Sequence, residues 1–284
     1  MRILYILPIV MMAASPALAQ NLDLGGPPNA PPVPIQITAS QGISWSQHDS
    51  TVTASGGAKA VRGDVTVTAD QLIAHYKPKK DATKAQAGAD SVLTQGGNQL
   101  TELDAVGHVH IYTATDNAWG DRAVYSTDQQ LLVLTGKNLK LTTPKDTVTA
   151  RDSISYYAGE HKAIARGNAL ITTTDGRSVA ADIIIGYFAA QTDKNANGGL
   201  EKVDALGHVV ITTPTDSASG DKAVYVPGTG EARLGGDVHI THGENNLAGS
   251  DALVNMKSGT ATLLATPGGR VSGVILPNSG NAKQ

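Results

Sequence analysis

The chain repeats itself at a distance of one hundred residues. The segment Asp104–Tyr125 returns as Asp204–Tyr225, and 15 of the 22 aligned residues are identical without a gap. A shorter pattern, a glycine followed by alternating apolar residues, recurs about every 30 residues where no insertion intervenes. Its glycines are Gly57, Gly107, Gly136, Gly167, Gly207 and Gly236. Internal repeats of this length are typical of stacked architectures, so we expect one continuous stack rather than two separate domains.

Within each unit, apolar and polar residues alternate with a period of two. Val65 and Val67 flank Thr66, and Val109 and Ile111 flank His110. Such alternation turns one row of side chains toward a core and the other toward water. Turn residues interrupt these segments at short intervals, and no amphipathic helix is convincing. The sequence therefore predicts an all-β protein, elongated and open, with two stacked antiparallel sheets of about 16 to 20 strands in total.

An aspartate occupies the same place in each unit, a short distance from the repeated glycine. Six dispersed copies do not make one catalytic or calcium-binding constellation, so we interpret these aspartates as structural. We expect each to end a turn and to cap backbone amides before a strand begins, and the glycines to be turn residues. The aspartates are Asp70, Asp121, Asp152, Asp182, Asp221 and Asp251.

The N-terminus has the pattern of a secretory signal peptide over residues 1–19. Arg2 precedes the apolar run Ile3–Ala14, and Ala17–Ala19 forms a cleavage site, so we expect cleavage after Ala19. An uncleaved membrane anchor is the alternative, but the apolar run is shorter than the ~20 residues that span a membrane. Residues 20–34 are rich in Pro and Gly and predict a flexible leader. We expect the β domain at 35–276, loop insertions at 77–100 and 191–199, and a flexible tail at 277–284.

Composition excludes several classes of function. The chain has no cysteine, so burial and backbone pairing must stabilise it without disulfides. Its formal net charge is −3, which leaves no basic footprint for nucleic acid. Nucleophile, zinc-protease, P-loop and dinucleotide fingerprints are absent from the sequence, so we expect neither an enzyme nor a cofactor.

Two further clusters have a functional and a plain interpretation. His108 with His110, and His239 with His242, have spacings that could hold a metal, but a solvated strand histidine explains them better and no metal is expected. The lysines of the first insertion could meet lipid phosphates, yet a solvated loop is the favoured interpretation. These lysines are Lys77, Lys79, Lys80 and Lys84.

The repeated glycine and aspartate-to-tyrosine motifs resemble those of the OstA-like family of periplasmic lipopolysaccharide-transport proteins. They lie in Gly107–Tyr125, Gly167–Tyr187, Gly207–Tyr225 and Gly236–Val254. The resemblance implies a periplasmic protein with an open, slightly twisted β-jelly roll, whose apolar interior receives the lipid A acyl chains of lipopolysaccharide. It also implies strand pairing with an inner-membrane-anchored component, with an outer-membrane partner and, head to tail, with further copies.

On this interpretation the inward apolar rows line a lipid groove, whereas on the plain one they are an ordinary packed core. An acyl chain shielded from water gains ~0.8 kcal/mol per methylene, so a trough needs no catalytic residue. The alternatives are a structural or adhesive β-solenoid without lipid, or a membrane-anchored component of the same machinery. Candidate groove residues are Val65, Val67, Val109, Ile111, Leu132, Leu134, Leu139, Leu141, Ile171, Ile183, Ile185, Val209, Ile211, Val238 and Ile240, and candidate partner-pairing edges lie at Ile35, Ile37, Val271 and Ile275.

Overall fold

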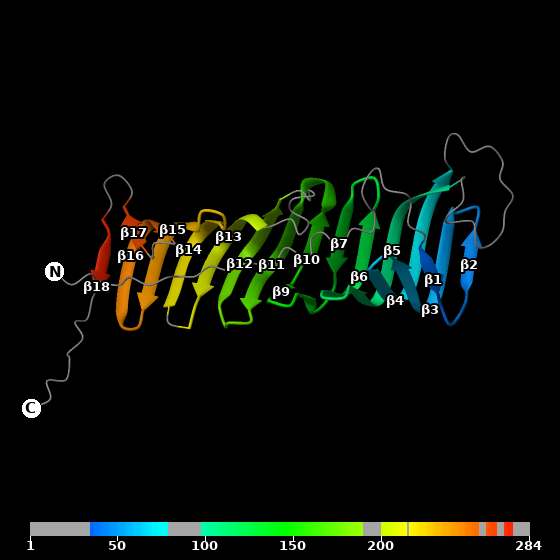
Figure 1. Cartoon of the computed structure of the whole chain (residues 1–284), viewed down its shortest axis with the longest axis horizontal. Coiled ribbons are helices and arrows are strands. Elements are labelled where there is room, and N and C mark those ends of the chain that lie inside the picture. The colour runs from blue at the N-terminus through cyan, green and yellow to red at the C-terminus, as the bar shows by residue number, and fades with distance from the viewer. Residues whose placement is uncertain are drawn as a thin grey trace, which may run out of the picture.

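The described residues form one antiparallel sheet of 18 strands that is stacked along a single long axis (Figure 1). A computed structural model describes residues 35–78, 98–189, 200–214, 216–255, 260–265 and 270–274. The predicted continuous all-β stack is confirmed. The predicted signal peptide, leader, second insertion and tail lie outside the described residues. Of the first insertion, Lys77 and Pro78 extend one strand and Asn98–Leu100 begin the next, so strand pairing continues into the predicted loop.

The strands follow one another along the stack in chain order. They are β1 (Gln36–Thr38), β2 (Ile43–Ser46), β3 (Thr51–Arg62), β4 (Val65–Pro78), β5 (Asn98–Tyr112), β6 (Asn117–Ser126), β7 (Leu131–Thr135), β8 (Leu139–Thr142), β9 (Asp146–Ala150), β10 (Ser153–Tyr157), β11 (Lys162–Thr173), β12 (Ser178–Phe188), β13 (Leu200–Thr212), β14 (Asp216–Val226), β15 (Glu231–His242), β16 (Asn245–Asn255), β17 (Thr260–Leu264) and β18 (Ser272–Val274), with a 3₁₀ turn, η2 (Ala158–Glu160), between β10 and β11.

Most strands bend once near the middle, at a shift in the pairing register. In β5 the residues up to Val106 pair with Arg122–Ser126 of β6, and pairing resumes at Val109 after one extra residue. The bend divides the sheet into two leaves. Leaf A holds β2, β7, β10, β17 and residues 51–55, 71–78, 98–106, 122–126, 162–166, 183–188, 200–206, 222–226, 231–235 and 251–255; leaf B holds β1, β8, β9, β18 and residues 58–62, 65–69, 109–112, 117–120, 169–173, 178–181, 209–212, 216–220, 238–242 and 245–249.

At most bends a glycine lies against an aspartate of the neighbouring strand, whereas at the bend of β3 Gly56 lies against Gln41. Gly207 has φ +76° and the next residue, His208, has φ 46°, and both lie in the left-handed region. A Cβ placed on Gly207 would lie 2.2 Å from Asp182 Oδ2, and one on Gly107 would lie equally close to Asp70 Oδ2. Glycine is therefore required here twice over, by its backbone angles and by the carboxylate that fills its Cβ position.

This geometry corrects the interpretation of the repeated glycines and aspartates as turns and strand starts. Gly57, Gly107, Gly167, Gly207 and Gly236 lie inside β3, β5, β11, β13 and β15. The aspartates Asp70, Asp121, Asp182, Asp221 and Asp251 lie inside β4, β6, β12, β14 and β16, and Asp152 directly precedes β10. A bulge uses the same residue types as a turn, because both need positive φ and a local acceptor, so the sequence pattern does not distinguish them.

Two of these bends also carry a histidine–aspartate pair. His108 Nδ1 lies 2.8 Å from Asp70 Oδ2, and His208 Nδ1 lies 2.8 Å from Asp182 Oδ2. The hydrogen bond to the aspartate, followed by its charge, raises the pKa of each histidine above 6.5. These two histidines therefore pair with aspartates at the bends while their side chains stay 90% exposed, in keeping with the expectation of solvated strand histidines.

We expect Gly207→Ala to destabilise the protein more than Gly176→Ala. Both glycines have positive φ, but Gly176 has nothing within 4 Å of its Cβ position. The strain of a left-handed alanine costs roughly 1–2 kcal/mol in both variants, and only Gly207→Ala adds the clash with Asp182. Urea unfolding followed by circular dichroism measures the difference. Equal losses in the two variants would show that the carboxylate contact does not constrain the bend.

We expect the His208 pKa to lie above 6.5 and to fall toward that value in Asp182→Asn. Because the folded-state pKa is raised, the pair stabilises the protein fully below the unfolded-state value, and the contribution disappears as pH rises through the folded pKa. NMR titration of the imidazole gives the pKa directly. His208→Asn is the matched control for stability, since Asn168 has the same backbone conformation in β11; its unfolding midpoint should lose this pH dependence between about pH 5 and 8.

Candidate functional site

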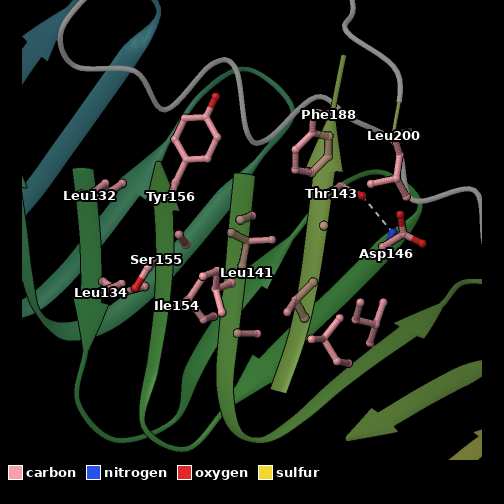
Figure 2. A pocket seen from close by; sticks show the side chains of 18 of the residues that line it. Leu132, Leu134, Leu141, Thr143, Asp146, Ile154, Ser155, Tyr156, Phe188 and Leu200 are labelled. Atoms are coloured by element: carbon pink, nitrogen blue, oxygen red, sulfur yellow. Dashed lines mark hydrogen bonds between the residues drawn. The ribbon is translucent and has the colours of Figure 1, made fainter. Parts of the chain in front are cut away.

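The main internal feature is an apolar cavity of about 120 Å³ between the two leaves, near the middle of the stack (Figure 2). Tyr156, Phe188 and Leu200 lie toward one end of it, and Leu134 and Ile154 lie deeper. Both leaves contribute walls. Leaf A supplies Leu132, Leu134, Ile154, Ser155, Tyr156, Ala163, Ile164, Ala165, Ile184, Gly186, Phe188, Leu200 and Val203, and leaf B with its turns supplies Ile111, Ala118, Leu141, Thr143, Asp146, Val148 and Ile171.

The cavity lies where the sheet is interrupted at its corner. Most strands pass through the bend, but here, as at the two ends of the stack, strands stop at it: β7 stops before Gly136 and β8 starts at Leu139. Likewise β9 ends at Ala150 and β10 begins at Ser153. Small residues such as Ala163 and Gly186 form part of the wall. Short side chains between the leaves leave volume that a longer aliphatic residue would fill.

Most of the predicted groove residues do point inward, but fewer than half line a cavity. Val65, Val67, Val109, Leu139, Val209 and Val238 are buried in close-packed interior. Ile211 and Ile240 line a second cavity of only about 20 Å³. The members that reach the central cavity are Ile111, Leu132, Leu134, Leu141 and Ile171. In the described part of the chain the predicted groove positions are thus divided between packed core and the two cavities.

The placement of Ile183 and Ile185 on the inner face is wrong. Ile184, which is 3% exposed, lines the cavity, while Ile183 and Ile185 are half-buried on the outer side of β12. Inward residues run Val179, Ala181 and then Ile184, because the bulge opposite β12 lies between these positions. The bulged strand β13 keeps its parity, with Ala205 and Val209 both buried, whereas β12, which has no extra residue, changes parity at the bend. Alternation counted on one side of the bend in β12 therefore fails on the other side.

Sequence reasoning also missed cavity residues in β10, β11 and the ends of β12 and β13. Ile154 and Tyr156 alternate within the segment Ser153–Tyr157 and could have been assigned to the core by period alone. Ile164 and Phe188 carry a weaker signal, since neither belongs to a long alternating run. No rule of alternation identifies Gly186 as a wall residue.

A four-residue turn with a buried aspartate forms part of the cavity wall on leaf B. The Asp146 amide donates to Thr143 Oγ1 over 2.9 Å, and the Thr143 amide donates to the Asp146 carbonyl over 2.8 Å (Figure 2). The same turn recurs at Thr113–Asp116 and Thr213–Asp216. Burial raises the pKa of Asp116, against the opposing effect of the Thr115 and Thr113 hydroxyls. These turns close leaf B hairpins, and they place polar groups at the end of an otherwise apolar space.

The other candidate clusters supply no site. His110 stacks between Tyr112 and Trp119, with ring centroids 4.7 and 4.9 Å away. His242 Nδ1 lies 2.5 Å from Asp216 Oδ1. No group of three His, Cys, Asp or Glu side chains that could hold a metal occurs among the described residues. Lys77 forms an ion pair with Asp128 at 3.0 Å, and the other lysines of that cluster lie outside the described residues.

Among the residues that the structure describes, no helix is long and apolar enough to cross a membrane.

We expect Ile184→Ala to destabilise the protein by about 2–5 kcal/mol, the usual cost of truncating a fully buried isoleucine. Ile185→Ala, on the outer side of the same strand, should cost less than half of that. Chemical unfolding of the two variants measures the difference. Similar losses would contradict the parity shift at the bulge.

Comparison with models of protein families identifies one family. The model of the family described as LptA/(LptD N-terminal domain) LPS transport protein matches twice, at residues 36–162 and 152–260. Among solved structures, LptH from Pseudomonas aeruginosa, described as the LptA homologous periplasmic component of a lipopolysaccharide transport device, is 18% identical. That match covers 46% of this chain and 95% of LptH, with a TM-score of 0.37. A search of curated proteins gave no match. Because the two family matches together span most of the chain, this protein belongs to the LptA/LptD N-terminal domain family of lipopolysaccharide-transport proteins.

Proposed function

We propose that the protein acts in the periplasm as a lipid carrier that shields the acyl chains of lipopolysaccharide between its two leaves. The observation that carries this proposal is the apolar cavity enclosed by both leaves in a member of a non-enzymatic lipopolysaccharide-transport family. A signal peptide over residues 1–19 would export the chain, and cleavage after Ala19 would release it. Lipid A is the expected ligand, and no cofactor takes part.

The energetics favour a shielded route across water. Each methylene removed from water gains ~0.8 kcal/mol, so the acyl chains of one lipid need an extended apolar surface. The central cavity of about 120 Å³ holds only part of one acyl chain, and most of the interior is filled. Binding a whole lipid therefore requires the leaves to separate. The bends at the corner would remain the hinge, since their glycines and aspartates do not face the interior.

The two ends of the stack are suited to pairing with partners. β1 and β2 pair along one edge of β3, and β17 and β18 pair along one edge of β16. Ile43 in β2 is 53% exposed and Val274 in β18 is 61% exposed, so apolar side chains accompany both edges. An edge strand presents unpaired backbone groups to another strand. Such pairing would join the protein to an inner-membrane-anchored component, to an outer-membrane component and, head to tail, to further copies.

Of the predicted edge residues, three lie in the described part of the chain. Ile35 and Ile37 pack partly buried against the core beside β1, so they hold the first edge in place. Val271, directly before β18, is 49% exposed. Ile275 lies outside the described residues. Their role in pairing with partners remains part of this proposal.

One observation favours a second candidate function, a structural β-solenoid without lipid. Val209 and Val238 are fully buried, as expected for a stack whose core stabilises the fold and binds no lipid. Purified mature protein that fails to bind lipid A would favour this alternative. An N-terminus that still carries residues 1–19 after cell fractionation would instead indicate a membrane-anchored component of the transport machinery.

We expect benzoylphenylalanine in place of Ile111 or Ile211 to crosslink to lipopolysaccharide in living cells, because both side chains face the interior. Val210, the outward neighbour of Ile211, is 39% exposed and is the matched control that should capture little. Immunoblotting with an antibody against lipopolysaccharide reads the result. Capture that is absent at both inner positions in a folded protein would overturn the lipid function.

We expect the same photoreactive residue at Ile43 or Val274 to capture another protein, either a second copy or a transport partner. Lys222, which is exposed on β14 in the middle of the second half of the stack, is the control. Mass spectrometry of the crosslinked species identifies the partner. Equal capture at Lys222 would show that the sheet edges have no special role.

A further inference from the structure

The family model matches two segments of the chain, here called the first and second family units, and these two units share one strand. The first match to the family model ends at residue 162 and the second begins at residue 152, so β10 lies in both. β10 pairs with β7 of the first unit through Ile154↔Leu134 and with β11 of the second through Ile154↔Ala165. The two units therefore join by the same antiparallel pairing that builds each of them.

The backbone of the two units confirms that they are copies. In β5–β6, Val106 pairs with Arg122 and Val109 with Gly120. In β13–β14, Leu206 pairs with Lys222 and Val209 with Gly220. Every residue in the second set follows its counterpart by one hundred, and the bulge falls at the same place. The two units therefore share the pairing register of these strands and the position of the bend, as well as the sequence.

Each unit also has its own hydrophobic core. One cluster runs from Val52 to Tyr156 and the other from Ala150 to Val254. Val148 and Ile154 are packed against both clusters. The boundary between the two cores therefore lies at β9 and β10, where the strands are interrupted at the corner.

The central cavity spans this boundary. Ile111 and Leu141 belong to the first unit, whereas Ile184 and Phe188 belong to the second, and all four line the same space. Away from the joint, Leu72 in the first unit is 1% exposed, Val238 in the second has no exposed surface, and the cavity at Ile211 holds only about 20 Å³. The cavity is thus a product of the joint and not of either unit.

We propose that this joint is a distinct acyl-chain binding site, at which a lipid passes from the first unit to the second inside one chain. The inference rests on the proposed lipid function. An apolar cavity of ~150 Å³ stays dry and accepts an apolar molecule the size of benzene, so a cavity of about 120 Å³ fits a short segment of an acyl chain. Because the joint is covalent, no gap between separate molecules interrupts the apolar path there.

The test compares the joint with the interior of each unit in the full-length protein. Benzoylphenylalanine replaces Phe188 at the joint, a close match in shape, and replaces Leu72 or Val238 in the unit interiors. The probe is lipid A, added to the purified folded protein at limiting concentration. We expect capture at position 188 to exceed capture at positions 72 and 238. Equal capture at all three positions would overturn a distinct site while leaving the lipid function intact, and capture at none would overturn both.

A second variant fills the cavity without relying on crosslinking. Gly186 has ordinary backbone angles, and a Cβ there meets Phe188 and Leu200 only at van der Waals distance. Gly186→Leu should weaken lipid A binding about tenfold, the effect of displacing roughly two buried methylenes. Ala180→Leu, on the outer side of the same strand, is the control and should bind normally. Unchanged binding by Gly186→Leu at an unchanged melting temperature would contradict the site.

Discussion

The contact between an aspartate carboxylate and the α-carbon of a glycine on the neighbouring strand determines the cross-section of this protein. Asp182 fills the place where Gly207 would carry a side chain, and Asp70 does the same at Gly107. A strand bends where its glycine adopts positive φ, and the neighbouring strand bends beside it because the two are paired. Repetition of this contact along the stack produces two leaves from one sheet, and the enclosed space between the leaves follows from it.

The bend also decides which side chains are inside. The extra residue of the bulge lies on β13, and the paired strand β12 changes its alternation at the bend, so that Ile184 faces the core although Val179 and Ala181 set the opposite parity on the other side of it. Alternation within one arm is reliable, as Val109 and Ile111 illustrate, since both are 1% exposed. Inward and outward positions could therefore be predicted from the sequence within the part of a strand on one side of its bend. The prediction failed at Ile183 and Ile185, which lie just beyond the bend of β12 and face outward.

The central cavity lies at a place where strands stop at the corner, although the glycine–aspartate contact persists there at Gly136 and Gly167. Between β7 and β8, and between β9 and β10, the strands end at the corner instead of passing through it. The two units meet at this point, and the cavity lies between their cores. A tandem arrangement of this kind gives one chain the length of two family units. Transport along it would then need fewer joints between separate molecules.

The sequence alone determined the all-β class, the continuous stack and the family, because strand alternation and repeated motifs are local properties that survive in every copy. It also placed candidate edges at the first and last strands of the stack, and their role in pairing stays a prediction. Only the tertiary structure decided that glycine and aspartate form bends, that Ile184 and Phe188 face one cavity, and that this cavity lies at the joint. The reason is physical: a cavity is the volume left between side chains from strands far apart in the sequence, and no local pattern records which of those side chains meet.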